Sequence, residues 1–167
     1  MLCAVFLAAL GVALISTPSI ANQGDTWRVS ISSSGEQGNN WSGTCSISAN
    51  DRYVSFSSGA SNLVPGDTNG VPDGFVYDRV TGATERVSVS SSGEQGNDSS
   101  GGGYLSADGR YVAFASQASN LVPGDTNGSW DIFVHDRVTG STERVSVSSS
   151  GEQGSADSFY CSISADG

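Results

Sequence analysis

The sequence predicts an all-β protein, a β-propeller of four-stranded antiparallel blades, and three observations support this. A 58-residue repeat begins at Arg28, Arg86 and Arg144, each period holds four short strand-like runs, and no window of helix length shows a 3.6-residue apolar period. Periods 28–85 and 86–143 are identical at 41 of their 58 positions. Four strands per repeat of this length are typical of propeller blades, whose radial arrangement leaves only short edges exposed.

Each element of the blade can be placed in the second period. The expected strands cover residues 103–106, 110–116, 131–137 and 143–149, with tight turns at Asp108-Gly109 and Thr139-Gly140. Large side chains alternate with small ones along these runs, so a large face of one blade can pack on a small face of the next. A β-sandwich with a duplicated 58-residue unit is the alternative fold.

The phase of the repeat predicts two complete blades plus partial flanking strands. Propellers usually close with four to eight blades, so we expect further blades of a full-length chain, mainly downstream, as packing partners. The lone N-terminal strand would be the outer strand of a neighbouring or ring-closing blade. The expected segments are a signal peptide at 1–21, a lone strand within 22–43, blade and linker at 44–101, blade and linker at 102–159, and the start of a further blade at 160–167.

The N-terminal residues have the layout of a secretory signal. Residues 2–15 are almost wholly apolar, and Ser19 and Ala21 are small residues at the −3 and −1 positions of a cleavage site. The apolar run is short for a bilayer span, so we expect export to the periplasm, cell surface or medium, with no membrane span after cleavage. No Lys or Arg precedes the run, which leaves an upstream start or a retained anchor as alternatives.

Two motifs carry a family resemblance. Residues 106–116, SADGRYVAFAS, followed by residues 131–140, DIFVHDRVTG, resemble the TolB-like (WD40-like Pro-Asp repeat) β-propeller family, whose blades carry a Ser-Pro-Asp-Gly turn before an apolar strand. Ala107 stands in place of that proline, and Asn50-Asp51 in place of Asp-Gly in the first blade. The resemblance covers residues 27–167. It implies the propeller fold and, for function, a scaffold, an interaction platform or an enzyme accessory domain.

A repeated acidic loop is the candidate metal site. In a loop that begins Gly-Asp-Thr-Asn-Gly, oxygen-bearing side chains stand at positions 1, 3 and 7 counted from the first Asp, a pattern that resembles part of a calcium loop. The alternative is structural: Asx-turns in the loop, with its last Asp holding the loop to the following strand. The candidate calcium ligands are Asp67, Asn69, Asp73, Asp125, Asn127 and Asp131.

The arginines and cysteines follow the repeat. All seven arginines occupy three repeat positions, which predicts packing and blade-to-blade ion pairs with residues such as Asp78, Asp136 or Glu85. Cys45 and Cys161 lie two periods apart at the same place on a blade. Equivalent positions two blades apart are too distant for a disulfide, so we expect two separate buried thiols in the innermost strands.

The sequence gives little support to catalysis or nucleic-acid binding. The net charge of −10 lacks the basic stripe that a phosphate backbone requires. No Gly-x-Ser-x-Gly motif occurs, and the only histidine, His135, has Tyr77 as its repeat counterpart. We therefore expect no catalytic site in this chain.

The function expected from these features is that of an exported, non-catalytic module that binds a protein or carbohydrate partner or acts as a scaffold. Trp41 and Trp130 stand where the two blades differ, and these are the candidate partner-binding residues. One alternative is the accessory propeller of a prolyl-oligopeptidase-like hydrolase whose catalytic domain lies outside this sequence. Another is a structural repeat module of a large surface protein.

Overall fold

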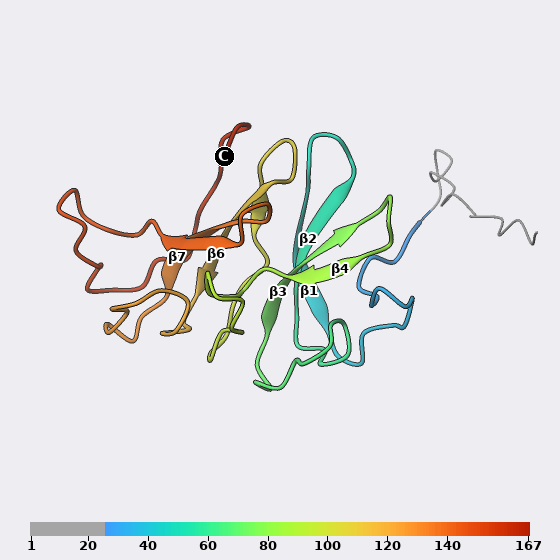
Figure 1. Ribbon diagram of the computed structural model, residues 1–167, viewed down its shortest axis with the longest axis horizontal. Coiled ribbons are helices and arrows are strands. Elements are labelled where there is room, and N and C mark those ends of the chain that lie inside the picture. The colour runs from blue at the N-terminus through green and yellow to red at the C-terminus, as the bar shows by residue number, and fades with distance from the viewer. Residues whose placement is uncertain (1–25) are drawn as a thin grey trace, which may run out of the picture.

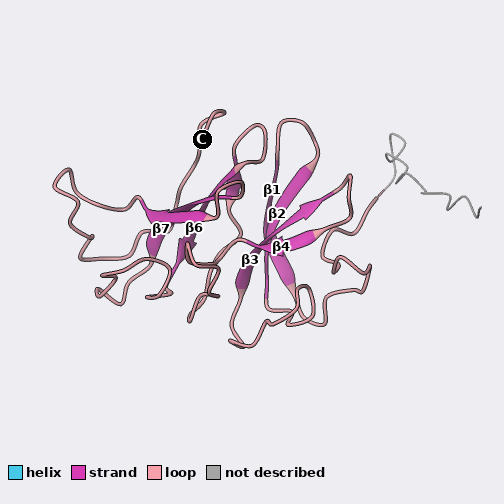
Figure 2. Cartoon of the chain, in the orientation of Figure 1, coloured by secondary structure: helices cyan, strands magenta, loops and turns pink. Residues whose placement is uncertain are grey.

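A computed structural model describes residues 26–167, and within them all regular structure is β (Figure 2). The predicted signal peptide at 1–21 and the first residues of the segment 22–43 lie outside the described residues. Two four-stranded sheets stand side by side like fanned blades (Figure 1). No helix in residues 26–167 is long and apolar enough to cross a membrane.

Both sheets are antiparallel, and their strands follow chain order, which confirms the two predicted blades. The first blade orders its strands β1-β2-β3-β4 and the second β5-β6-β7-β8. The strands are β1 (Ser42–Ile47), β2 (Tyr53–Ser58), β3 (Asp73–Asp78), β4 (Thr84–Arg86), β5 (Tyr104–Leu105), β6 (Tyr111–Ser116), β7 (Asp131–Asp136) and β8 (Ser141–Arg144).

Each blade has a Phe face, on which paired aromatic rings pack. Phe56 of β2 pairs with Phe75 of β3, and their ring centroids lie 5.7 Å apart. The second blade repeats this pair with Phe114 and Phe133 at 5.9 Å. Leu63, from the loop between β2 and β3, is buried against the first pair. Alternation along the strands therefore places the bulky core on one face of each blade.

The opposite face of each blade, the Val face, carries smaller side chains and meets the next blade. Val76 and Val87 of the first blade pack against Val112 of β6, and all three are buried. The backbone of the second blade approaches closely here, since a Cβ on Gly102 would collide with the Thr44 carbonyl and lie 2.6 Å from the Ser57 nitrogen. The junction between the two blades is thus closed by glycine backbone as well as by valine side chains.

The predicted strand within 22–43 is corrected by the structure. Residues 27–33 form no strand; Ile31 makes a single bridge to Gln37. The segment turns back at Gly35, whose φ is +83°. The Ser32 carbonyl accepts a hydrogen bond from the Gly35 amide and closes the turn. Val29 and Ile31 then pack on the Phe face of the first blade.

The predicted fourth strand at 143–149 lies earlier in the chain than expected, because the residues after it also form a turn. β8 ends at Arg144, and the following Ser-Ser-Ser-Gly-Glu-Gln-Gly segment forms the same turn. The first two of these linkers each attach to the outermost strand of the blade that follows. Thr84 donates its amide to the Ser33 hydroxyl at 2.9 Å, and Thr142 donates to the Ser91 hydroxyl at the same distance.

The predicted blade-to-blade ion pair is confirmed for Arg137 with Glu85, whereas the arginine pairs with Asp78 and Asp136 each join strands of one blade. Arg52 binds both carboxylate oxygens of Asp78, at 3.0 and 2.7 Å, and Arg110 binds Asp136 in the same way. Arg137 links the two blades, because it pairs with Glu85 of β4 while its guanidinium lies 4.1 Å from the Tyr53 ring centroid. The bidentate Arg52–Asp78 and Arg110–Asp136 pairs fix the ends of the strands within each blade relative to one another.

The two described cysteines are free thiols, as the repeat phase predicted. Cys161 is half-buried, but the prediction that both thiols are buried fails for Cys45, which is exposed. Cys45 lies on the edge strand β1, next to a bulge at Gly43–Cys45.

Candidate functional site

The predicted metal ligands of the first blade come together where the loop at 66–72 enters β3. Asp73 is completely buried and accepts hydrogen bonds from the Ser88 hydroxyl at 2.6 Å and the Asn69 amide at 3.0 Å. The same Asn69 amide donates to the Gly96 carbonyl of the following linker. Asp73 therefore holds the loop, the strand and the linker together.

A guanidinium group occupies the centre of this cluster. Arg86 Nη1 lies 3.3 Å from an Asp73 oxygen and 3.5 Å from an Asp67 oxygen, and it donates to the Gln95 side-chain oxygen at 2.8 Å. We call Asp67, Asn69, Asp73 and Arg86 the Asp–Arg cluster. The second blade repeats it with Asp125, Asn127, Asp131 and Arg144, whose Arg–Asp distances are 3.1 and 3.4 Å.

Burial dominates the electrostatics of the cluster. It raises the pKa of Asp67 above the usual value, the nearby Asp73 carboxylate adds to the rise, and Arg86 opposes both. Burial likewise raises the pKa of Asp125, against the opposing effect of Arg144. The arginine in each blade thus neutralises carboxylates that are poorly solvated.

The donor set of the cluster does not match a calcium ion as it stands. Asn69 directs its NH₂ group toward Asp73, and its oxygen accepts the Val71 amide. Hard cations bind six to eight oxygens, whereas Arg86 already takes the facing oxygens of both aspartates. Residues 26–167 hold no group of three or more His, Cys, Asp or Glu arranged for a metal. Calcium binding stays a prediction, and this geometry favours the structural alternative.

The two predicted partner-binding tryptophans lie on different blades. Trp41 precedes β1 and is 54% exposed, with its indole nitrogen over Gly59 and beside Asn40. Trp130 precedes β7, and its ring centroid lies 5.7 Å from that of Phe159 with the planes tilted by 44°. Phe159 is itself 52% exposed. Sequence reasoning missed Phe159, whose ring contacts that of Trp130.

At five positions near Trp130, the residue is larger than its counterpart one 58-residue period earlier. Trp130 and Ile132 replace Pro72 and Gly74 of the first blade, 58 residues earlier. The backbone geometry is kept, since the Ser158 amide donates to the Trp130 carbonyl at 2.7 Å just as Ser100 donates to Pro72 at 2.8 Å. The remaining replacements are Phe159, Tyr160 and Cys161 in place of Gly101, Gly102 and Gly103. We call these five residues the aromatic edge.

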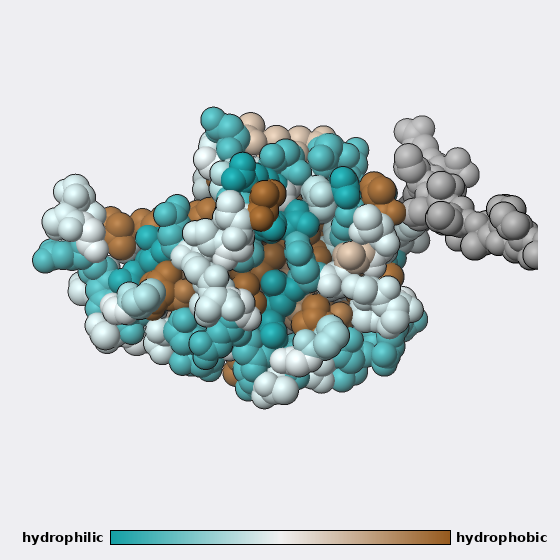
Figure 3. Space-filling model, viewed as in Figure 1, coloured by the Kyte–Doolittle hydropathy of each residue, from teal (hydrophilic) through white to brown (hydrophobic). Residues whose placement is uncertain are grey.

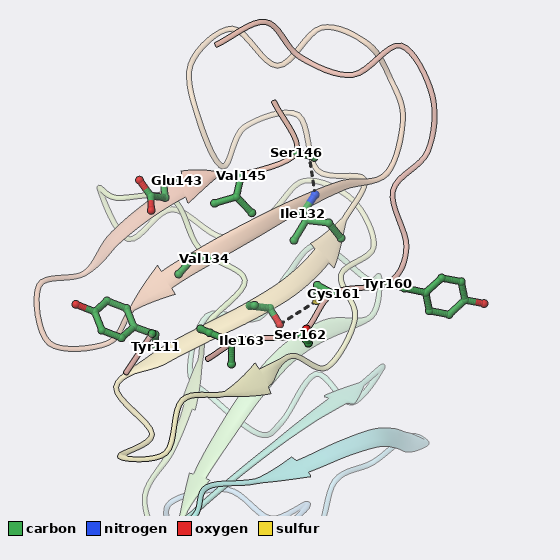
Figure 4. A pocket seen from close by; sticks show the side chains of 12 residues that line it. Tyr111, Ile132, Val134, Glu143, Val145, Ser146, Tyr160, Cys161, Ser162 and Ile163 are labelled. Carbon is green, nitrogen blue, oxygen red and sulfur yellow. Dashed lines mark hydrogen bonds between the residues drawn. The ribbon is translucent and has the colours of Figure 1, made fainter. Parts of the chain in front are cut away.

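A cavity of about 550 Å³ adjoins the aromatic edge on the Val face of the second blade. Figure 4 shows Val134, Val145 and Ile163 around it, with the Tyr160 ring pointing away toward solvent. The Cys161 thiol donates to the Ala113 carbonyl at 3.5 Å, and burial raises the pKa of this thiol. On the face viewed in Figure 3, hydrophobic residues form separate patches among hydrophilic ones.

His135 is placed as a packing residue. It is buried on β7, and its Nδ1 lies 2.8 Å from the Thr142 hydroxyl. Burial lowers its pKa, so the imidazole is predominantly neutral at pH 7. The repeat places Tyr77 at the same buried position of the first blade.

Comparisons with known proteins give similarity in fold. No protein-family model matches the chain, and a search of curated proteins finds no match. Similar solved structures include TolB from Acinetobacter baumannii, with 23% identity over 79% of this chain and a TM-score of 0.48. A protein named as a TolB in Agrobacterium tumefaciens shows 17% identity over 65% of this chain and a TM-score of 0.43. The chain spans 25% and 31% of those two proteins.

Proposed function

We propose that this chain is part of an exported, non-catalytic β-propeller that binds a protein partner through Trp130 and Phe159. The observation that carries the proposal is the replacement of Pro72 and Gly101 by these two aromatic residues, on an otherwise repeated backbone. Exposed aromatic side chains are enriched at the centres of protein interfaces, where they contribute much of the binding energy.

The position of the pair supports an accessible binding surface. Pro72 and Gly101, their counterparts, are only partly buried even though the first junction is filled by the second blade. Trp130 and Phe159 would therefore stay at the surface whether or not a further blade follows. Export is proposed from the signal-like residues 1–21. The absence of catalysis is proposed from the buried position of His135, which faces Thr142.

The test is selection of ligands from a phage-displayed random peptide library, with a glycan array as a parallel probe. We expect peptide ligands whose affinity falls by about tenfold or more for Trp130→Ala and Phe159→Ala, because either change removes half of the aromatic surface. Trp41→Ala, which alters an exposed tryptophan of the first blade, is the matched control and should bind as the unchanged chain does.

Three outcomes would overturn the proposal. Selected peptides that bind both aromatic variants with unchanged affinity would place recognition elsewhere. Binding confined to the glycan array would identify a carbohydrate partner instead. Cleavage of a bound peptide or glycan during the assay would show that the chain is catalytic.

A further inference from the structure

Each blade carries an open pocket between the turn of its linker and the loop that joins its second and third strands. In the first blade this pocket has a volume of about 480 Å³ and lies between residues 32–36 and residues 61–66. The second blade repeats it between residues 90–94 and residues 119–124, with a volume of about 470 Å³. Small-molecule sites typically have volumes of about 300–1,000 Å³. We call these two cavities the linker pockets.

Neighbouring blades do not fill the linker pockets. The two blades pack against each other, yet the pocket of each stays open. Both walls of a pocket come from one repeat, and in the first blade Asn62 joins them. Its amide donates to the Glu36 carboxylate at 3.1 Å and to the Gln37 carbonyl at 2.9 Å. Asn120 joins the walls of the second pocket in the same way. Each pocket is therefore built by its own repeat.

The lining of the two pockets is identical. All ten residues that line the first pocket recur unchanged in the second. Exposed residues of the first blade outside the pocket do change, since Trp41 and Asn50 correspond to Ser99 and Asp108. Core packing does not require an exposed Glu36, so its recurrence with the rest of the lining points to a role at the surface.

The lining combines an apolar wall with hydrogen-bonding groups. Residues 63–65, Leu-Val-Pro, supply the apolar part. The Ser61 hydroxyl accepts a hydrogen bond from the Asn39 amide at 3.1 Å, so its own proton is free to donate. The Glu36 carboxylate can only accept, and Asn62 binds one of its two oxygens. A ligand that fits must therefore donate to the carboxylate, accept from a hydroxyl and present an apolar surface.

These groups favour a neutral sugar over a charged ligand. Among the residues that line the two described pockets, none is Lys, Arg or His, and the carboxylates of Glu36 and Glu94 would repel an anion. A cation would pair with these glutamates, but both are exposed, and ion pairs between exposed charges contribute little. The hydroxyls of a sugar both donate and accept, and its C–H groups can pack on the apolar wall.

We propose that the linker pockets bind neutral sugar residues, one in each blade, through Glu36 and Glu94. This site is separate from Trp130 and Phe159 and goes beyond the function proposed above. The sugar can be free in solution or part of a glycan, because both present the same hydroxyl and C–H groups to the pocket.

NMR titration of the full ¹⁵N-labelled chain with glucose, galactose, mannose and N-acetylglucosamine tests the proposal. We expect at least one sugar to shift the amide signals of Glu36 and Glu94 together, because the two pockets are alike. Glu36→Ala should weaken binding at the first pocket by about tenfold or more and leave the second unchanged, since it removes a charged hydrogen-bond acceptor. Glu94→Ala should do the reverse.

Glu152→Ala is the matched control, because Glu152 stands at the same position of the third linker but contacts the Ser150 hydroxyl instead of a loop asparagine. It should leave sugar binding unchanged. Melting curves of all three variants should match that of the unchanged chain, which separates lost binding from lost folding. An array of oligosaccharides that carry the same sugar then separates the two sources: retention of the chain identifies a glycan, and binding of the free sugar alone identifies a soluble ligand.

Three results would overturn the proposal. The first is that none of the four sugars shifts the Glu36 and Glu94 signals and the array retains no chain. The second is sugar binding that persists unchanged in the double variant Glu36→Ala plus Glu94→Ala. The third is that spermidine, titrated in parallel, shifts these signals when no sugar does, which would assign the pockets to a cation. Trp130→Ala should leave sugar binding unchanged, so failure of this proposal is distinguishable from failure of the proposed function.

Discussion

Replacing Arg86 by methionine tests the Asp–Arg cluster, because it keeps the length of the side chain and removes its charge. The side chains of Arg86, Asp67 and Asp73 are only 10%, 5% and 0% exposed. Removing one partner from a buried ion pair costs about 3–5 kcal/mol. Asp73 keeps its hydrogen bonds from Ser88 and Asn69, so we expect the lower end, about 3 kcal/mol. At 2–4 °C per kcal/mol, the melting temperature should fall by about 6–12 °C.

Thermal unfolding followed by far-UV circular dichroism measures this loss. Arg28→Met is the matched control, since Arg28 stands at the same repeat position but is exposed and donates to Gln37. We expect that control to change the free energy of unfolding by less than about 0.5 kcal/mol. A loss below about 1 kcal/mol for Arg86→Met, or an equal loss for the control, would refute the reasoning.

The pH dependence of the variant gives an independent check. Without Arg86, nothing opposes the burial that raises the pKa of Asp67. A carboxyl whose folded pKa is raised above its unfolded value stabilises the fold at low pH and loses that contribution as pH rises. The stability deficit of Arg86→Met should therefore shrink as pH falls from about 7 to about 4. A deficit that stays constant would contradict this account.

The same cluster tests the calcium prediction. Because Arg86 already pairs with Asp67 and Asp73, we expect millimolar calcium to leave the melting temperature of the unchanged chain constant. A rise that disappears after Asp67→Ala plus Asp125→Ala would instead show that calcium displaces the guanidinium.

Three further predictions concern the core, an ion pair and the junction. Phe114→Ala should lower the free energy of urea unfolding by about 3–5 kcal/mol, whereas Tyr160→Ala, at 96% exposure, should change it by less than about 0.5 kcal/mol; similar losses would contradict the core assignment. Burial favours a raised pKa for Asp78, but hydrogen bonds, first that of Arg52, lower the pKa to about 2. The Arg52–Asp78 pair therefore contributes to the free energy of unfolding above the unfolded pKa near 4, and this contribution is lost as pH falls through about 2. Arg52→Gln should raise the Asp78 pKa in an NMR titration, and an unchanged value would speak against the pair. Gly102→Ala should lower the melting temperature, since its Cβ would collide with backbone; an unchanged melt would mean that the junction can open.

The blades could be predicted from the sequence because their determinants are local. Alternating large and small residues place β6 and β7 to within a residue of the structure. Asp73 was expected to anchor its loop because an Asx-rich turn precedes it. The charge that pairs with it could not be predicted, since Arg86 comes from a different strand 13 residues away and only the fold brings its guanidinium between two carboxylates.

The aromatic edge shows a different limit. Trp130 stands out because it is a rare residue in a loop that otherwise repeats. Phe159 lies in a linker where the earlier period has glycine, and strand patterning says nothing about such positions. Trp130 and Phe159 are seen to lie together only when the second period is compared position by position with the first, whose junction is closed. The misplaced strand at 27–33 has a similar origin, because Ser33 finds its partner, Thr84, 51 residues further along the chain.

That serine contact also bears on how such a protein could be duplicated or rebuilt. The linker at 27–38 covers the Phe face of the blade that follows it, and the linker after β4 is hydrogen-bonded to the outermost strand of the second blade. A segment cut at 44 and 101 would lack the linker at 27–38 that packs on its own blade, and would carry the linker that contacts the second blade. The transplantable unit instead runs from about residue 27 to residue 86, which includes the cover and all four strands. Gene duplications and engineered swaps that respect this offset should yield blades that fold, whereas those cut at the strand boundaries should expose an aromatic face.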